Sequence, residues 1–409
     1  MTVPSLILHF TLFLAIALIG ARLTNWLGIP DLVGFLLIGF ILGPDVLNFL
    51  PLPHSGIAHH LMDAVIGISL ALVLFDAGLQ TSLGALRRHL NSVLLLSTAG
   101  ILLTTLSVTA ISRPLFNWTA LQGFQTGAIM ASTDPTAVMP ILSAIILPTG
   151  LFETLVSEAA IGDITSSLLT TGAISLSSSH NQSTEIWITG WTVRTIGSII
   201  IGVLIGILSR RFLTRIPPFD AAHLFPFWLF ILITAGYGLG EEIGGSGFLS
   251  DYIAGLLIGN PMSLTSFLPA GSPGLIPTVS KWAHSLVFGS HILIFGLLGA
   301  QMHSLKGEIS PLHLIIFVLA FLYLIRPAIV FALVPFDRRS RFSLKSLLFM
   351  SYIRETGILS AALLALYRDH LTDGEVAVIS WTIIGTLLLP AMTTRTVAKK
   401  LFGDHHSVS

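Results

Sequence analysis

The sequence contains no cysteine and little charge. None of its 409 residues is Cys, and Asp, Glu, Lys and Arg together make up 10% of the chain. Without cysteine there can be no disulfide framework, thiol catalysis or thiolate-bound metal. A soluble domain of this size carries roughly a quarter charged residues, so the low content excludes a water-soluble fold. The formal net charge is 0, which argues against nucleic acid or any strongly charged partner.

What the sequence has instead is a succession of apolar runs. Hydrophobic residues make up 53% of the chain, and a helix needs about 20 apolar residues to cross a membrane. We expect one transmembrane domain over residues 1–400, surrounded by lipid, with a short cytoplasmic tail over 401–409. Any regulatory subunit would have to be a separate chain. The runs predict an all-α membrane protein of about thirteen transmembrane helices, near residues 5–24, 31–50, 61–80, 92–112, 121–147, 153–177, 190–211, 223–240, 247–260, 283–304, 311–336, 344–367 and 374–394.

The distribution of Lys and Arg predicts the orientation of these helices. With the N-terminus outside, fourteen of the twenty basic residues lie at cytoplasmic helix ends and four at outer ends. Cytoplasmic ends carry the excess of positive charge in membrane proteins. We therefore expect the N-terminus outside and the C-terminus in the cytoplasm, in the cell (inner) membrane. The first run could be misread as a signal peptide, but no basic residue precedes it, since Arg22 is the first.

The chain contains an internal repeat. The Gly-rich segment 34–44 in the second span is similar to 247–261 in the ninth span, seven spans later. An odd offset means that equivalent helices run in opposite directions across the membrane. We therefore predict two inverted six-helix repeats, about 5–177 and about 223–394, joined by a linker helix at about 190–211. Inverted repeats are typical of alternating-access carriers, which bind their substrate between interrupted helices at mid-membrane depth.

Two helices of the predicted repeats carry polar interruptions at corresponding positions. The fifth span contains Thr133-Asp134-Pro135, and the twelfth contains Arg354-Glu355 within an apolar run. Pro135 removes a backbone donor, which favours a break in the helix. At such a break an acid would neutralise the positive end of one half-helix, and a base the negative end of the other. Asp134 and Arg354 have the right charges for these roles, although a simple proline kink with an Asp cap is an alternative.

The sixth span carries two carboxylates, Glu158 and Asp163. A charge at this depth costs at least about 2.5–3.5 kcal/mol, and a spacing of five residues turns the two side chains about 140° apart. We predict that Glu158 pairs with Arg354, which leaves Asp163 as the exchangeable carboxylate. Such a group can hold a proton or a monovalent cation, but not both at once. The alternative is a permanently ion-paired Asp163.

Other intramembrane charges are interpreted as structural. Asp76 is expected to be a capping or interface acid, and Asp251 and Arg326 to pair with each other or with the backbone. The fourteen histidines show no two-ligand spacing on one helix, so neither a metal site nor a cofactor is expected beyond the transported cation.

Together these segments resemble the monovalent cation:proton antiporters, in particular the electroneutral, NhaP-like branch. The resemblance rests on Gly43-Pro44, Thr133-Asp134-Pro135, Glu158 with Asp163, Ser246-Gly-Phe-Leu, Arg326-Pro327 and Arg354. It implies the NhaA/NapA-like antiporter fold, a homodimer, cation or proton binding at Asp163 with Thr133 and Asp134 at the helix crossing, and the Glu158–Arg354 pair.

The sequence departs from that family's usual pattern. Ala159 and Gly162 replace a Ser and an Asn that would supply oxygen ligands, and Glu355 replaces a Gly. Ser157 and Glu355 are possible accessory ligands, although Glu355 could also face water. The sequence as a whole predicts exchange of Na⁺ or K⁺ for protons and no enzymatic activity. A K⁺ efflux system, a gated cation channel or an organic-acid carrier on the same scaffold are the alternatives.

Overall fold

The computed structural model describes most of the chain. The residues described are 3–27, 31–44, 46–49, 56–84, 89–134, 147–148, 150–178, 184–213, 218–260, 275–301, 309–337 and 342–402. Every regular element within these ranges is helical, in agreement with the all-α prediction. Pro135 and Pro140, which the sequence placed in a broken helix, lie outside the described residues.

Each predicted span contains a described helix, although several helices begin or end well away from the predicted bounds. In the first half of the chain they are α1 (Val3–Leu27), α2 (Asp31–Leu42), α3 (Ile57–Gln80), α5 (Leu90–Leu94), the π-helix η1 (Leu95–Gly100), α6 (Ile101–Phe116), α7 (Ala120–Met130), α9 (Leu151–Ser178) and α10 (Thr184–Leu213). In the second half they are α11 (Pro218–Glu242), α12 (Gly247–Gly259), α13 (Leu275–Gln301), α14 (Pro311–Ala320), the π-helix η3 (Phe321–Ile325), α15 (Arg326–Leu333), η4 (Val334–Phe336), α16 (Leu344–Tyr352), α17 (Ile358–Leu366), η5 (Arg368–His370) and α18 (Asp373–Phe402).

The helices have the length and composition of membrane spans. Within the described residues, six helices or uninterrupted helical runs are long and apolar enough to cross a membrane, and three shorter ones are similarly apolar. Large apolar side chains of the described helices, such as Phe227 of α11 and Leu208 of α10, are more than half exposed. In water such side chains would be covered, whereas lipid tails solvate them.

The chain folds into two compact units. Unit 1 comprises residues 1–63, 89–166 and 291–409, and unit 2 comprises 64–88 and 167–290. Each unit draws on both predicted repeats. Unit 1 contains every candidate ion-binding residue named from the sequence.

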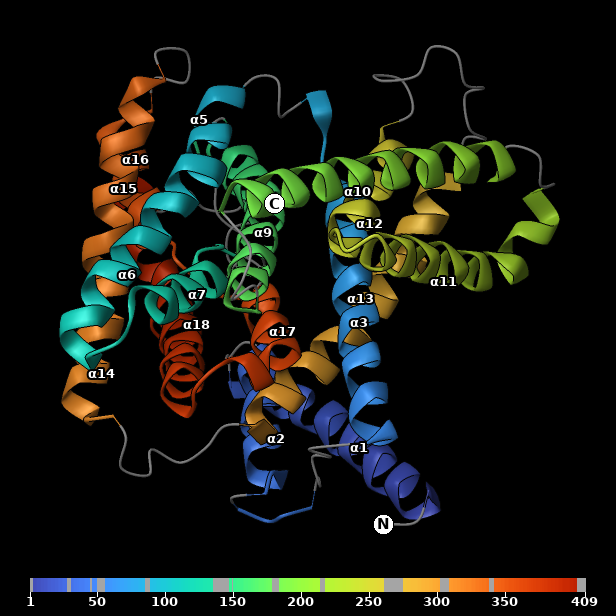
Figure 1. Ribbon diagram of the computed structural model, residues 1–409, viewed down its shortest axis with the longest axis horizontal. Coiled ribbons are helices and arrows are strands. Elements are labelled where there is room, and N and C mark those ends of the chain that lie inside the picture. Colours follow the sequence, from blue (N-terminus) through green and yellow to red (C-terminus); the bar gives the residue numbers. More distant parts are fainter. Residues whose placement is uncertain are drawn as a thin grey trace. The chain divides into compact units, whose positions relative to one another are not determined.

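Unit 1 contains two long helices that change from α to π and back to α without interruption. Helices α5, η1 and α6 follow one another directly, as do α14, η3 and α15 (Figure 1). A π-turn leaves wider spacing along the backbone and is frequent near functional sites. Both π segments here lie against the part of unit 1 where the polar residues gather, since η1 packs on α15 and η3 packs on α16.

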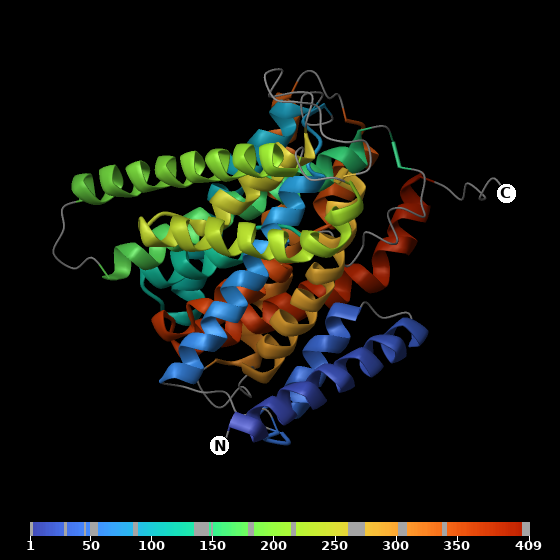
Figure 2. The ribbon, with the colours of Figure 1, turned by 90° about the vertical axis from the view of Figure 1, so that its right-hand side faces the viewer.

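Unit 2 contains a tight three-helix packing of α10, α11 and α12. Helices α10 and α11 lie side by side in both views (Figures 1 and 2), and α12 packs on both of them. Glycines permit the close approach: a Cβ at Gly202 would meet Ser250 of α12, and one at Gly240 would meet Gly247. Small residues at helix interfaces are the usual device for close packing in membranes.

Two helices of unit 1 end where the sequence predicted interruptions. Helix α7 stops at Met130, and residues 131–134 are non-helical. Helix α16 stops at Tyr352, and α17 begins at Ile358 after the non-helical residues 353–357. The break in the twelfth span is therefore confirmed. The thirteen-span count and the inversion of the repeats stay predictions.

Candidate ion-binding site

The two non-helical segments of unit 1 cross each other in the interior. The backbone N–H of Asp134 donates a hydrogen bond to the carbonyl oxygen of Glu355 at 2.9 Å. Ser360 Oγ, in the first turn of α17, donates to the carbonyl of Ile129 near the end of α7 at 2.6 Å. These bonds satisfy backbone groups that the interrupted helices leave open, which a buried break in a membrane protein requires. The crossing is therefore held by main-chain contacts as well as by side chains.

Asp134 lies at the positive end of α17. Its Oδ2 accepts a hydrogen bond from the backbone N–H of Ile358, the first residue of that helix, at 3.0 Å. Gly357 makes this approach possible, because a Cβ at that position would overlap the Asp134 carboxylate. A carboxylate at a helix N-terminus is stabilised by the unpaired N–H groups and by the helix dipole. The expected neutralising position of Asp134 is confirmed.

Arg354 lies at the negative end of α7. Its Nη2 donates to the carbonyl of Met130, the last residue of α7, at 3.1 Å, and its Nη1 donates to Thr133 Oγ1 at 2.7 Å. The guanidinium also stands 4.7 Å from the ring centroid of Phe321, a cation–π distance. The side chain is 2% exposed, so these contacts replace its hydration.

The partner predicted for Glu158 was wrong. Glu158 accepts two hydrogen bonds from Arg326, Nη1 to Oε1 at 2.6 Å and Nη2 to Oε2 at 3.0 Å. Arg326 also donates from Nε to the carbonyl of Met350 near the end of α16, at 3.2 Å. Of the two partners expected for Arg326, Asp251 or the backbone, the structure shows the backbone, through the Met350 carbonyl. Arg354 faces Thr133 and Met130 instead, because the end of α7 offers it a carbonyl and a hydroxyl.

Asp163 lies beside the hydroxyl of Ser132. Ser132 Oγ donates a hydrogen bond to Asp163 Oδ1, and both side chains are buried. Neither arginine of the crossing forms an ion pair with Asp163 within the described residues. Three carboxylates of the crossing thus have different neighbours: Glu158 is bound by an arginine, Asp134 lies at a helix end and Asp163 lies beside a hydroxyl.

Comparison with known proteins assigns the chain to a family. Residues 12–400 match the family described as sodium/hydrogen exchanger, transmembrane. The chain belongs to this family of exchangers. The K(+)/H(+) antiporter NhaP2 of Shewanella oneidensis is 29% identical over 263 residues, which are 63% of this chain and 44% of that protein. The chain thus spans less than half the length of that relative.

Two archaeal proteins extend the comparison. The probable Na(+)/H(+) antiporter 2 of Methanocaldococcus jannaschii is 28% identical over 309 residues, 72% of this chain and 68% of that protein. The solved structure of the sodium proton antiporter MjNhaP1 from the same organism aligns with a TM-score of 0.79 at 20% identity. That alignment covers 98% of this chain and 99% of the other. The chain is therefore a multi-pass membrane protein with the MjNhaP1 fold, and the family resemblance drawn from its motifs is confirmed.

Ser132 lies next to one of the positions where the sequence lacks a ligand. A Cβ at Gly162 would come 3.7 Å from Ser132 Oγ. The hydroxyl of Ser132 therefore reaches the region that a longer side chain at position 162 would enter. Sequence reasoning missed Ser132, although it stands directly before Thr133 in the interrupted helix.

The residues predicted as possible accessory ligands, Ser157 and Glu355, are buried. Ser157 is 8% exposed, and Ala159, which replaces the usual serine, is 7% exposed. Glu355 is 0% exposed, so it does not face water, and its backbone carbonyl belongs to the crossing itself. A small cavity of about 10 Å³ is lined by Thr133, Glu158, Arg326 and Arg354 among others. That volume is about the space that one water needs.

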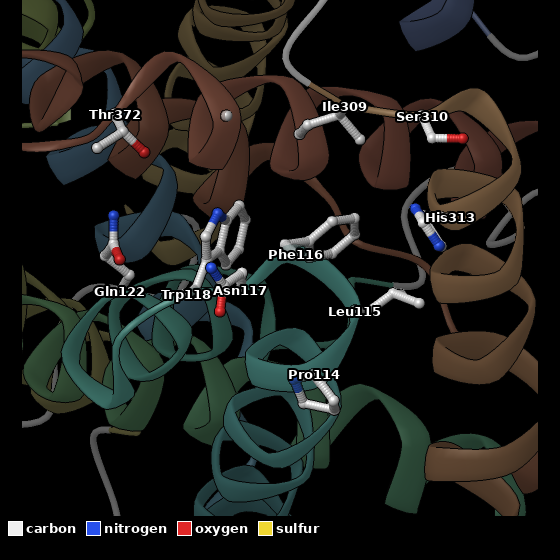
Figure 3. Close-up of a pocket in the computed structure, with 11 residues that line it drawn as sticks. Pro114, Leu115, Phe116, Asn117, Trp118, Gln122, Ile309, Ser310, His313 and Thr372 are labelled. Carbon is white, nitrogen blue, oxygen red and sulfur yellow. The ribbon is translucent and has the colours of Figure 1, made fainter.

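A larger cavity of about 490 Å³ lies at one end of unit 1, away from these carboxylates. The rings of Phe116 and Trp118 stand between Gln122 and Thr372 on one side and His313 on the other (Figure 3). The two aromatic ring centroids are 4.8 Å apart. Within the described residues there is no cluster of three His, Asp or Glu side chains suited to a bound metal.

Proposed function

We propose that this exchanger moves a monovalent cation, Na⁺ or K⁺, in one direction and protons in the other. The proposal rests on the different binding partners of the carboxylates at the crossing. Glu158 is bound by both Nη atoms of Arg326, and Asp134 caps α17, whereas Asp163 faces a hydroxyl. Asp163 is then the carboxylate whose charge another cation can neutralise.

Cation and proton compete for Asp163 in this proposal. A proton or a Na⁺ or K⁺ ion neutralises the same carboxylate, so the two are bound in turn. Ser132 Oγ, Thr133, Asp134 and backbone oxygens at the crossing supply further oxygen ligands, with Ser157 and Glu355 as possible accessory groups. Alternating access then comes from movement of one helix bundle against another around this site.

The wider arrangement is proposed on the same basis. The chain would form a homodimer in the cell (inner) membrane, with its N-terminus outside and its C-terminus in the cytoplasm. Its transmembrane domain would consist of two inverted repeats, about 5–177 and about 223–394. The names of the relatives, a K⁺/H⁺ and a probable Na⁺/H⁺ antiporter, support both cations as candidates.

The test is ion exchange in proteoliposomes that contain the purified protein and a pH-sensitive dye. Addition of Na⁺, K⁺ or Li⁺ dissipates an imposed pH gradient if the protein exchanges that cation, and Asp163→Asn abolishes the response. Asp373→Asn is the matched control, because Asp373 is an exposed carboxylate of unit 1 paired with Arg368. Normal exchange by Asp163→Asn would refute the mechanism. Cation flux that needs no pH gradient and moves no protons would instead indicate the channel alternative.

A further inference from the structure

Asp251 is a buried carboxylate of unit 2. It is the fifth residue of α12 and is 0% exposed. Within the described part of the chain, neither Oδ1 nor Oδ2 has a hydrogen-bond partner. By contrast, Glu158, Asp134 and Asp163 at the crossing each accept at least one hydrogen bond.

The carboxylate of Asp251 packs directly on the backbone of α11. A Cβ at Gly236 would overlap Oδ1 of Asp251, so the absence of a side chain at Gly236 makes room for the carboxyl group. One turn away, Gly240 packs on Gly247, and on the other side Gly202 of α10 packs on Ser250. The carboxyl group is thus enclosed by closely packed helices.

Several ionisable side chains of the surrounding helices have other neighbours. On α11, Glu241 accepts a hydrogen bond from the N–H of Gly247 at 2.9 Å, and the Tyr237 hydroxyl lies against Gly67 of α3. On α10, Arg194 lies against Gly244. On α3, Asp76 accepts from Gln80 at 2.6 Å and approaches His284 of α13 at 3.5 Å. Within the described residues, no basic side chain forms an ion pair with Asp251.

We propose that Asp251 is a proton-binding site of the folded protein, separate from the exchange site at Asp163. An ionised carboxylate that is buried without a partner is strongly unfavourable, and a group in that position takes up a proton instead. The reaction is the addition of one proton from solvent to one carboxylate oxygen, which leaves a neutral carboxylic acid between α11 and α12. Release of that proton would place a bare charge against the backbone at Gly236 and favour separation of the two helices.

The proton can be detected directly by infrared spectroscopy. A protonated carboxyl group has a C=O stretching band distinct from the bands of a carboxylate. Purified Asp163→Asn protein serves as the background, so that Asp163 itself contributes no band. The spectrum of Asp163→Asn minus that of Asp163→Asn/Asp251→Asn, taken at neutral pH, shows a protonated-carboxyl band if the proposal is right. A difference spectrum with only carboxylate bands would overturn it.

The pH dependence of stability gives a second, independent test. The folded chain holds a proton on Asp251 that the unfolded chain releases at neutral pH, so raising the pH favours unfolding. One linked proton changes the unfolding equilibrium constant about tenfold per pH unit. The constant for the wild-type protein should therefore rise about tenfold more per pH unit than that of Asp251→Asn, in the range where Asp251 is protonated only in the folded state.

Two further variants keep this test decisive. Asp251→Leu removes the proton but fills the same space with an apolar side chain, and it should show the same flatter pH profile as Asp251→Asn. Asp63→Asn, at a partly exposed carboxylate, should keep the wild-type profile. Equal pH profiles for the wild-type protein and both Asp251 variants would refute the proposal. Stabilisation by Na⁺ or K⁺ that Asp251→Asn abolishes would also refute it, because the site would then bind a metal cation.

Discussion

Arg326 and Arg354 lie in one buried cluster but hold different partners. Arg326 binds both oxygens of Glu158 and the carbonyl of Met350, whereas Arg354 binds Thr133 and the carbonyl of Met130. Each guanidinium therefore satisfies a carbonyl at the C-terminal end of an interrupted helix. A bidentate Arg–carboxylate pair has a fixed geometry that Lys cannot reproduce.

This pairing predicts the energetic coupling between the three residues. Removing one partner of a buried pair costs about 3–5 kcal/mol, because the other is left charged and alone. Glu158→Gln and Arg326→Gln should each destabilise the protein by such an amount, and the double variant should recover part of the loss. The double-mutant cycle of Glu158→Gln with Arg354→Gln should show a smaller coupling energy than the cycle with Arg326→Gln. Thermal unfolding of the purified variants measures both cycles, and a larger coupling to Arg354 would contradict the structure.

Ser132 is expected to contribute to cation binding. Ser132→Ala removes the hydroxyl that donates to Asp163 and leaves one oxygen ligand fewer near the position of Gly162. We expect the cation concentration for half-maximal exchange to rise about tenfold, as the loss of one hydrogen bond to a charged group implies. Ser97→Ala is the control, because among the described residues the buried Ser97 hydroxyl donates to the carbonyl of Val93, one turn before it, and not to a carboxylate. Equal half-maximal concentrations for the two variants would exclude this role.

The partners of these residues could not be predicted from the sequence, for a definable reason. The sequence identified Glu158 and Asp163 in the sixth span, and Arg354 in the twelfth, as charges near the middle of the membrane. Depth alone allows either arginine to reach Glu158. The choice depends on the ends of α7 and α16, because each offers a carbonyl to one guanidinium, and only the packed structure shows which end faces which arginine.

Among the helices, the crossing depends on the close approach of two chain segments at Gly357. Asp134 can cap α17 only because position 357 has no Cβ. Gly357→Ala should therefore displace the Asp134 carboxylate from the N–H of Ile358, destabilise the protein by about 1–3 kcal/mol and slow exchange. Gly238→Ala is the control, because a Cβ at Gly238 of α11 meets nothing within 4 Å. Thermal unfolding and proteoliposome exchange compare the two, and equal effects would contradict the assigned contact.

The helices themselves were largely predictable because apolar runs of membrane length are a strong signal. The interruption of the twelfth span followed from Arg354 and Glu355 within such a run, and α16 and α17 separate there. The π-helices η1 and η3 were not predicted. Their residues, such as Leu95 and Phe321, are as apolar as their neighbours, so the change in winding leaves no mark in the pattern.

For the whole molecule, the predicted orientation can be tested on a single helix. Helix α18 is 30 residues long, about 45 Å at 1.5 Å per residue, which exceeds the hydrocarbon thickness of a membrane. Its two ends should therefore lie on opposite sides. The native chain has no cysteine, so Asp373→Cys and Lys400→Cys would each carry a single thiol at an exposed position.

A membrane-impermeant maleimide applied to intact cells should label Asp373→Cys and leave Lys400→Cys unlabelled until the cells are opened. The reverse pattern would place the C-terminus outside and overturn the orientation drawn from the Lys and Arg distribution. Exchange activity of both variants confirms that the labelled proteins are folded.

The fixed positions of the two arginines have a consequence for the response to membrane voltage. Arg326 and Arg354 are each held by side-chain and backbone oxygens, so they do not leave with the transported ion. If one proton replaces one monovalent cation on Asp163, the formal charge of the crossing is the same with the proton or the cation bound. The membrane potential then acts equally on the proton-bound and the cation-bound protein. A change in membrane potential should therefore leave the relative populations of these two forms unaltered.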